Sequence, residues 1–366
     1  MESEHRFPGS YAAEDVSFLL RRLTLAPVRI EEREQRIQSG RSHYSEMIGP
    51  EDAPTRERMR LFRESLAANG PRLARDLVTL TAMLAESAPG GELTITSIAR
   101  AGTPIGVLLT RLLRAQFGPE RVRHYSISVI RDRGIDLHAL DFIAARHGAG
   151  TIRFIDGWTG KGTIATEIAS SLAQAGRDYD RIDAGLWVPL DISGSARRAA
   201  SEDDYLIPSS LLGGTVSGLV SRSVLPRADI GTRQYHGCVE LSHLRRYDLS
   251  RWFVQKMAAL CDHAQPLLAP THPEAAAARF AHSQQFIDEL MREFSIRDRN
   301  RVKIGIGETV RVALRRLPER ILVRDSASPD AARLTRLARL RGVPVEHRPS
   351  MPHAAVGLIA NVLERA

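Results

Sequence analysis

The sequence is poor in lysine and in cysteine. Three lysines, Lys161, Lys256 and Lys303, stand among 51 basic residues, so nearly all of the positive charge comes from arginine. The two cysteines, Cys238 and Cys261, have 22 residues between them, a spacing that excludes the common zinc motifs. Free thiols in a reducing compartment are the plain interpretation.

Long apolar runs are also absent. No stretch approaches the ~18 apolar residues that a membrane-spanning helix needs. The N-terminal residues carry acidic side chains early and lack the basic-then-apolar pattern of a secretory signal. We therefore expect a cytoplasmic protein that does not contact a membrane; the sequence does not indicate its oligomeric state.

The composition that remains indicates more than one folded domain. A chain of 366 residues with 43% apolar content is long enough for two or three cores. Its charge is uneven, because residues 301–366 hold 13 basic and 6 acidic residues, whereas residues 1–300 hold 38 and 37. A basic tail behind a neutral body favours a polyanionic partner for the tail.

Apolar periodicity predicts an α/β protein. Residues 11–88 have a mostly helical pattern, broken at Asn69-Gly70-Pro71. Strands and helices then alternate, which is typical of a parallel sheet covered on both faces. The predicted strands lie at 92–99, 122–130 and 151–156, and the predicted helices at 103–118, 136–148 and 162–176.

The rest of the chain is less regular. A strand is predicted within 183–194, and a loop followed by a helix over 201–225. A second α/β pattern runs from about residue 300. We therefore divide the chain into a helical N-terminal extension (1–90), a central domain (91–260), a linker or bridging helix (261–299) and a basic C-terminal domain (300–366).

Three loops follow predicted strands and carry unusual chemistry at the edge of the sheet where ligands bind. In "SIARAGTPIG" (97–106), Arg100 precedes Ala101 and Gly102 at a helix start, where free N–H groups favour an anion such as a diphosphate. In "SVIRDRGID" (128–136), Arg131 and Arg133 suit a mobile flap over an anion. A plain turn and a solvated charged loop are the respective alternatives.

The third loop, "FIDGWTGKGT" (154–163), resembles a nucleotide-triphosphate P-loop but has the wrong spacing. Two residues separate Gly157 from Gly160-Lys161, where the P-loop motif needs four. Asp156 ends the strand and suits a pair of ribose hydroxyls. The turn Thr159-Gly160-Lys161-Gly162-Thr163 suits a terminal phosphate at the next helix. This combination indicates a ribose-phosphate site.

The three loops resemble those of type I phosphoribosyltransferases. "FIDGWTGKGT" is similar to their acidic and Thr-Gly-Gly-Thr loop, although Gly157 replaces the second acid and the loop is one residue short. "ARAGTP" is similar to their pyrophosphate loop, which often contains a cis peptide, and "RDRGID" falls where they have a flexible hood.

Further motifs narrow the resemblance. With "SGRSHYSEMI" (39–48), the segment 203–225 and "YHG" (235–237), residues 10–260 resemble the phosphoribosyltransferase-like proteins of bacterial tellurite-resistance and stress gene clusters, often labelled the cysteine protease StiP family. The tail resembles a Pelota-type RNA-binding domain. The resemblance implies a type I phosphoribosyltransferase-like parallel sheet with flanking helices, plus a smaller α/β/α domain.

The resemblance also implies a function, a phosphoribosyltransferase that handles phosphoribosyl diphosphate or a related nucleotide in a stress pathway. Mg²⁺ would bind mainly through the diphosphate. Asp156, Arg100, Arg131 and Arg133 would be catalytic, and the substrate would be held by Ala101, Gly102, Thr159, Gly160, Lys161, Gly162 and Thr163. RNA would bind through Arg311, Arg315, Arg316, Arg339 and Arg341.

Two other functions stay open. Loss of the second loop acid suits a regulatory protein that binds ribose-phosphate or RNA without turnover. The family label suggests a cysteine peptidase, which needs a thiolate beside a histidine. The segment "IPSSLLGGTVSGL" contains no cysteine, so Cys238, two residues after His236, is the remaining candidate for a nucleophile.

Overall fold

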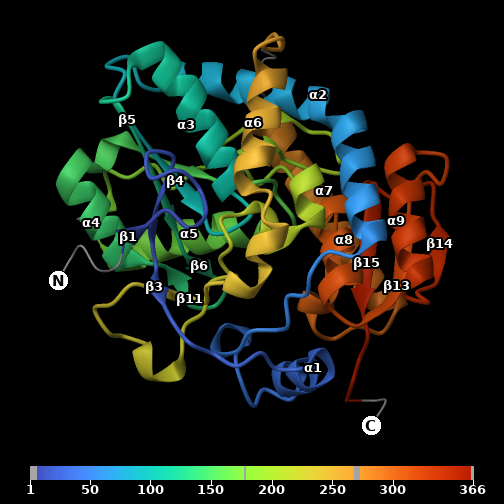
Figure 1. Ribbon diagram of the computed structural model, residues 1–366. Helices are drawn as coiled ribbons and strands as arrows, with labels where there is room; N and C mark the ends of the chain where they lie inside the picture. The colour runs from blue at the N-terminus through green and yellow to red at the C-terminus, as the bar shows by residue number, and fades with distance from the viewer. Residues whose placement is uncertain (1–5, 177–178, 268–272, 364–366) are drawn as a thin grey trace.

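The structure, a computed structural model, describes residues 6–176, 179–267 and 273–363. Its described residues contain one large sheet with helices on both faces and one smaller sheet near the C-terminus, which carries its own helices (Figure 1). Within the described residues, no helix is both long enough and apolar enough to span a bilayer.

The large sheet contains seven strands in the described part of the chain and is parallel except at one edge, where β1 runs antiparallel to β2. In spatial order the strands are β1 (Arg6–Phe7), β2 (Ser17–Leu19), β5 (Val122–Ile127), β4 (Leu93–Ile98), β8 (Ile152–Ile155), β9 (Leu186–Leu190) and β10 (Arg198–Ser201). The central strand β4 is buried along its whole length, as expected for a sheet covered on both faces.

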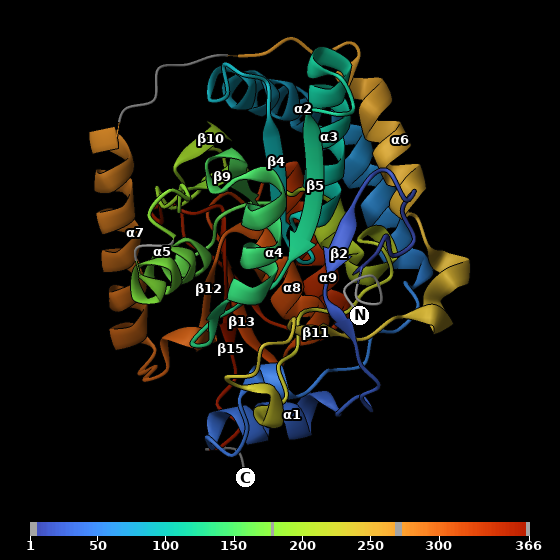
Figure 2. The same ribbon diagram turned by 90° about the vertical axis from the view of Figure 1, so that its left-hand side faces the viewer.

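Helices cover both faces of this sheet (Figures 1 and 2). One face packs against α2 (Arg56–Glu86) and α3 (Thr103–Phe117), with α6 (Ser250–Cys261) packed on both helices. The other face packs against α4 (Leu137–His147) and α5 (Thr163–Ala175), whose apolar side chains form a separate cluster with the sheet. The loops at the carboxyl ends of the strands are thereby fixed between two helical layers.

The C-terminal part is an α/β/α sandwich. Its sheet has the order β12 (Val302–Ile304), β15 (Ala355–Ile359), β13 (Pro318–Val323) and β14 (Val345–His347). Helix α7 (Pro273–Glu293) packs on one face through Ile287 and Leu290, and α8 (Ile306–Arg315) and α9 (Pro329–Leu340) cover the other. The layer order agrees with the predicted Pelota-like architecture, and α7, placed in the predicted linker, supplies one layer.

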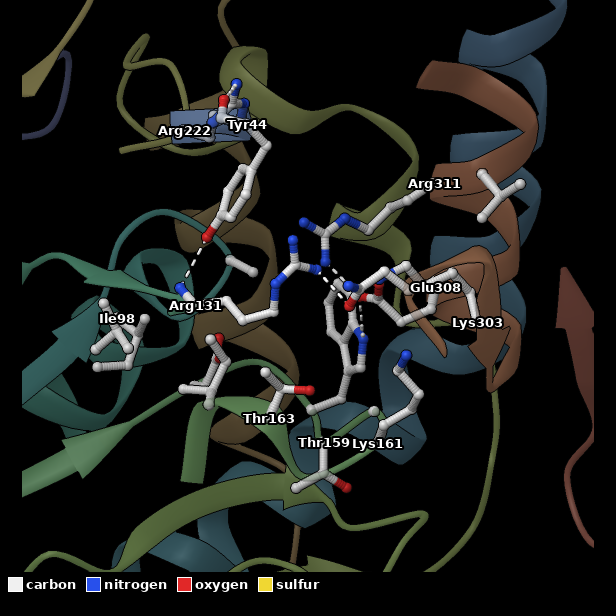
Figure 3. A pocket seen from close by; sticks show the side chains of 18 of the residues that line it. Tyr44, Ile98, Arg131, Thr159, Lys161, Thr163, Arg222, Lys303, Glu308 and Arg311 are labelled. Atoms are coloured by element: carbon white, nitrogen blue, oxygen red, sulfur yellow. Dashed lines mark hydrogen bonds and ion pairs between the residues drawn. The ribbon is translucent and has the colours of Figure 1, made fainter. Parts of the chain in front are cut away.

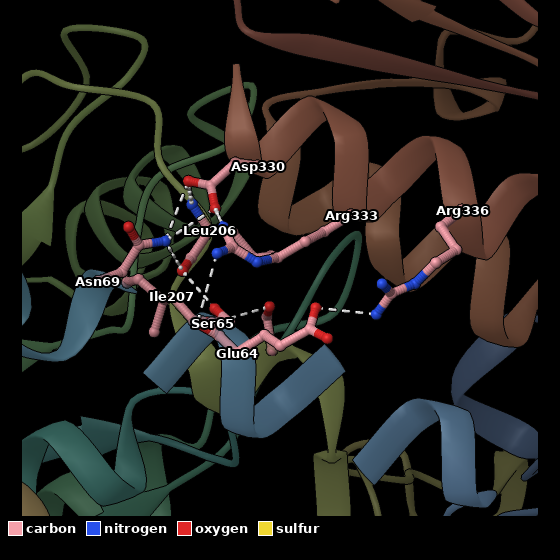
Figure 4. Close-up of polar contacts among 9 residues, drawn as sticks. Glu64, Ser65, Asn69, Leu206, Ile207, Asp330, Arg333 and Arg336 are labelled. Carbon is pink, nitrogen blue, oxygen red and sulfur yellow. Dashed lines mark hydrogen bonds and ion pairs between the residues drawn. The ribbon is translucent and has the colours of Figure 1, made fainter. Parts of the chain in front are cut away.

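Two buried carboxylates join this sandwich to the rest of the chain. Asp330, in the first turn of α9, accepts hydrogen bonds from the Asn69 amide at 2.9 Å and from the Leu206 N–H at 3.0 Å (Figure 4). Asp204 accepts the N–H groups of Ile306 at 2.9 Å and Ala354 at 2.7 Å. Because the two parts also share one apolar cluster, the sandwich is firmly docked.

The alternating strands and helices of residues 92–176 are confirmed, but three other local predictions were wrong. Residues 17–22 form the strands β2 and β3 (Arg21–Arg22) rather than helix. Helix α2 runs through Pro71 without ending, because its buried face holds it against the sheet and α6. The segment 201–225 forms short 3₁₀ turns in place of a helix, since Gly213 and Gly218 adopt positive φ there.

The predicted limits of the four regions stay predictions. Residues 1–5, 177–178, 268–272 and 364–366 fall within those ranges but outside the described residues.

Candidate functional site

The carboxyl ends of β4, β5, β8 and β9 meet at one edge of the large sheet, and the three predicted loops lie there. The loop after β4 leads directly into α3, and its Ala99–Arg100 peptide bond is cis. A side chain at Gly102 would place its Cβ 2.5 Å from the Ile155 carbonyl oxygen, so only glycine allows this close approach to β8.

Arg100 is buried within the molecule. Its guanidinium donates to the Val220 carbonyl at 2.7 Å and pairs with Glu51 at 2.5 Å, while its side chain also lines a cavity. Ala101 lines the same cavity. The sequence predicted a free N–H at Gly102 for a ligand. In the structure this N–H donates to the Ile98 carbonyl.

The loop after β8 carries Asp156 and the glycine-rich turn. Asp156 is 8% exposed and accepts the N–H of Gly157 at 2.7 Å. Burial raises the pKa of Asp156 to about 7. Gly162 has a φ of 85° and caps α5, and Thr159, Gly160, Lys161 and Thr163 line the cavity with it.

The hydroxyl of Thr159 donates to Asp191 at 2.7 Å, so this side chain supports the turn from behind. The Asp191 carboxylate also accepts the N–H groups of Gly194 at 2.9 Å and Ser195 at 3.1 Å. Asp191 therefore fixes two neighbouring loops and has a structural role.

The loop after β5 forms a small hairpin of β6 (Val129–Ile130) and β7 (Gly134–Ile135). Its Arg131 reaches into the cavity and donates to Asn300 at 2.6 Å, and its backbone N–H donates to the Tyr44 hydroxyl (Figure 3). The guanidiniums of Arg131 and Arg222 lie 4.8 and 5.2 Å from the centroid of the Tyr44 ring. Arg133 instead pairs with Glu46 and does not line the cavity.

The opposite wall of the cavity comes from the C-terminal sandwich. Lys303 on β12 and Glu308 and Arg311 on α8 face the loops of the large sheet (Figure 3). Arg315 on α8 also lines the cavity. Glu308 pairs with Arg311 and accepts the indole N–H of Trp158 at 3.3 Å. The cavity is thus shared by two parts of the chain that lie about 150 residues apart in sequence, as the Trp158–Glu308 contact shows.

The cavity has a volume of about 370 Å³, the size of a small-molecule site. Among the described residues, its acidic lining side chains are Asp156, Asp298 and Glu308. Its cationic lining side chains are far more numerous: Arg33, Arg100, Arg131, Lys161, Arg222, Arg301, Lys303, Arg311, Arg315 and Arg316. The site therefore has a strong excess of positive charge.

This crowding of cations is visible in their pKa values. Burial, followed by the field of Lys303 and nearby arginines, lowers the pKa of Lys161 to about 6. Burial lowers the pKa of Lys303 to about 8 and that of Arg222 to about 10. Burial and then Arg100 hold the pKa of Arg315 well below its usual value. An anion entering the cavity would relieve these charges.

The arginines predicted to bind RNA fall into two groups. Arg311, Arg315 and Arg316 point into the cavity, and Arg316 is further held by a bidentate contact with the buried Glu34. Arg339 and Arg341, at the end of α9, are exposed. The second group lies on an outer surface of the sandwich, whereas the first group lines the cavity.

Both thiols lie in the core. Cys238, on the short strand β11 (Gly237–Cys238), is 0% exposed, and burial raises its pKa to about 12. Burial likewise raises the pKa of Cys261 to about 12. The Nδ1 atom of His236 forms a hydrogen bond with the Ser128 hydroxyl at 2.8 Å. Among the described residues, no hydrogen bond joins Cys238 to a histidine.

The residues of the cavity do not form a magnesium site of their own. Mg²⁺ prefers several oxygen ligands, and Glu308 is already paired with Arg311. The described residues contain no cluster of three or more potential metal ligands. That Mg²⁺ enters the site bound mainly to the diphosphate of a ligand stays a prediction.

The fold and the cavity define a two-part α/β protein with a cationic site between a parallel sheet and a small sandwich. Residues 9–258 match the family model described as "Tellurite-like stress resistance cysteine protease StiP", and residues 281–361 match that of the PELOTA RNA binding domain. The chain therefore belongs to the StiP family.

A curated relative supports this assignment. The chain is 39% identical over 352 residues to "Cysteine protease StiP" of Acinetobacter baylyi. The aligned region covers 93% of this chain and 90% of the relative. No solved structure matches the chain.

These descriptions correct the function predicted from the sequence. The family and the relative are described as cysteine proteases, so the prediction of a phosphoribosyltransferase acting on phosphoribosyl diphosphate was wrong. The type I phosphoribosyltransferase fold is likewise not shown; a parallel-rich α/β sheet with flanking helices is. The Pelota match supports the predicted interaction with RNA.

Several lining residues were missed by the sequence analysis. Lys303, Glu308 and Trp158 come together only because the sandwich docks onto the large sheet. One signal was available for Lys303, since lysine is so rare in this chain.

Proposed function

We propose that the protein binds an anionic ligand carrying phosphate or a comparable oxyanion in the cavity between its two parts. The observation that carries this proposal is the excess of cations around the cavity, of which Arg33, Arg100 and Arg301 are buried and the others half-buried. Several of these cations have carboxylate partners, such as Glu51 for Arg100 and Glu308 for Arg311, but the cations outnumber the acidic groups that line the cavity. Crowded cations are costly, and proteins keep them mainly where a partner of opposite charge binds. A cavity of about 370 Å³ suits a small ligand or one group at the end of a larger one.

The Pelota match adds a second binding surface to this proposal. The exposed Arg339 and Arg341 suit contacts with RNA phosphates, and the cavity suits a separate anionic group. The two activities would share one docked sandwich, because α8 lines the cavity and α9 carries the exposed arginines.

Calorimetric titration with inorganic triphosphate, without divalent cations, tests the cavity. We compare wild type with Arg131→Gln, which removes a lining charge, and with Arg233→Gln, which makes the same change on an exposed loop residue. Loss of one charge-assisted contact predicts about tenfold weaker binding for Arg131→Gln, or about 1.4 kcal/mol, and little change for Arg233→Gln. Equal weakening in both variants, or no binding by wild type, would refute the proposal.

Proteolysis is the second candidate, and the descriptions of the family and the relative favour it. Cys238 lies two residues after His236 and Cys261 two residues before His263, but either thiol must become exposed before it can attack a peptide bond.

Hydrolysis of unfolded casein by wild type, Cys238→Ser and Cys261→Ser decides this candidate. Loss of activity in Cys238→Ser alone would identify the nucleophile. Equal activity in all three proteins would exclude both thiols, and a thiol alkylation time course would show whether either becomes accessible.

A further inference from the structure

Two of the three lysines of this arginine-rich chain line one cavity. Lys161 lies in the turn before α5, and Lys303 lies on β12 of the sandwich (Figure 3). The third, Lys256, is an exposed residue of α6. A guanidinium keeps its proton in proteins, whereas a buried amine can lose it and act as a nucleophile. Two of the three side-chain amines that could act as nucleophiles therefore line the cavity.

The surroundings of Lys161 favour a neutral amine. Its Nζ atom donates to the Arg299 carbonyl. The charged groups with the largest effect on it are Lys303, Arg299 and Arg131, opposed by Asp298. Burial and these cations lower its pKa to about 6, so most molecules carry a free electron pair on Lys161 at pH 7.

Lys303 differs from Lys161 because a carboxylate faces it. Glu308 favours the charged form of Lys303, whose pKa falls only to about 8. The arrangement pairs a neutral amine with a neighbouring ammonium, a pattern that activates lysine nucleophiles.

We propose that Lys161 is a nucleophile that forms an imine with the carbonyl group of an anionic aldehyde or ketone bound in the cavity. This inference rests on the proposed function, because the surrounding arginines would hold the anionic group of that substrate. It adds a covalent step and a substrate class, a phosphorylated carbonyl compound, to simple anion binding.

The step balances without an oxidant or a reductant. The Lys161 nitrogen attacks the carbonyl carbon, the carbonyl oxygen takes up a proton, and the resulting carbinolamine loses one water to form the C=N bond. Asp156 lines the same cavity and, with its pKa raised to about 7, carries a proton in part of the molecules at neutral pH. It is the group that can protonate the departing hydroxyl.

The charge of the substrate matters for this step. A protonated imine adds one positive charge to a cavity already rich in cations, which is unfavourable by itself. A phosphate on the same molecule offsets that charge. It also favours the ammonium form of Lys161 before attack, so the nitrogen must lose a proton to attack, and the imine regains that proton. Neutral aldehydes should therefore react more slowly than phosphorylated ones.

Reductive trapping tests the inference. Wild type is incubated at pH 7 with glyceraldehyde 3-phosphate and sodium cyanoborohydride, which converts an imine to a stable secondary amine, and peptides are mapped by mass spectrometry. An ordinary lysine is neutral in fewer than about one molecule in a thousand at pH 7, so we expect labelling at Lys161 at least about tenfold faster than at Lys256. Inorganic triphosphate should protect Lys161.

Two variants and one probe complete the design. Lys161→Arg keeps a donor to Arg299 but should abolish the adduct, whereas Lys256→Arg should leave labelling of Lys161 unchanged. Glyceraldehyde without phosphate should label Lys161 at least about tenfold more slowly; an equal rate would overturn the anionic substrate class.

The possible failures are distinguishable. If triphosphate binds to wild type but no adduct appears at Lys161, the imine inference is wrong and the proposed function stands. If triphosphate does not bind, the proposed function fails and the imine inference fails with it. Wild-type mapping gives the decision even if Lys161→Arg does not fold.

Discussion

Binding of an anion in the cavity should draw protons from solution. Sulfate is a suitable probe, because it resembles a phosphate dianion but does not titrate near neutral pH. A bound dianion favours the charged forms of Lys161 and Lys303 and the neutral form of Asp156. All three effects have the same sign, so the complex holds more protons than the free protein.

The magnitude follows from the three pKa values. With pKa values of about 6, 8 and 7, the two lysines and Asp156 are protonated at pH 7 in about 10%, 90% and 50% of molecules. If the anion restores full protonation of both lysines, uptake is about one proton per molecule, and Asp156 adds up to about half a proton more. Affinity should therefore fall as pH rises from 6 to 9.

Calorimetry in two buffers with different ionisation enthalpies measures this uptake directly. The difference between the observed binding enthalpies, divided by the difference between the buffer enthalpies, gives the number of protons taken up. Lys161→Arg should remove most of the uptake that comes from the lysines, because arginine stays charged at every pH used. Binding without proton uptake, or with proton release, would refute the reasoning about the buried cations.

Two further predictions concern the sandwich. Asn69→Ala removes an amide donor from the buried Asp330 carboxylate and should destabilise the protein by about 1–3 kcal/mol, measured by urea unfolding. The control is Gln285→Ala, on an exposed part of α7. Equal stability of both variants would contradict the role of Asn69. Arg339→Gln and Arg341→Gln should each reduce the salt dependence of single-stranded RNA binding by about one charge contact, measured by fluorescence anisotropy; an unchanged slope would place the RNA elsewhere.

Local sequence patterns predicted the parallel core well. Strands such as β4 and β8 are short apolar runs directly followed by turn residues and an apolar-periodic helix, and these signals act within a few residues. Pro71 and the glycines of 201–225 were harder to interpret. Tertiary packing held α2 straight in the first case, and backbone conformations absent from the pattern decided the second.

The sequence predicted one wall of the cavity and missed the other. The residues contributed by the sheet, including Asp156, Arg131 and Lys161, could be found because parallel strands bring their carboxyl ends to one edge. The wall contributed by α8 could not, since its position depends on contacts such as those of Asp330 and Asp204 with distant segments. Arg311, Arg315 and Arg316 were therefore interpreted as RNA-binding residues, although they line the cavity.

The shared wall of the cavity makes docking and ligand occupancy a single thermodynamic cycle. A ligand that touches both Lys161 and α8 binds only when the sandwich is seated, so each increment of its binding free energy also holds the sandwich in place. Reciprocity follows: any RNA that favours the seated sandwich must tighten the cavity's ligand by the same factor, and any RNA that favours an unseated one must expel it.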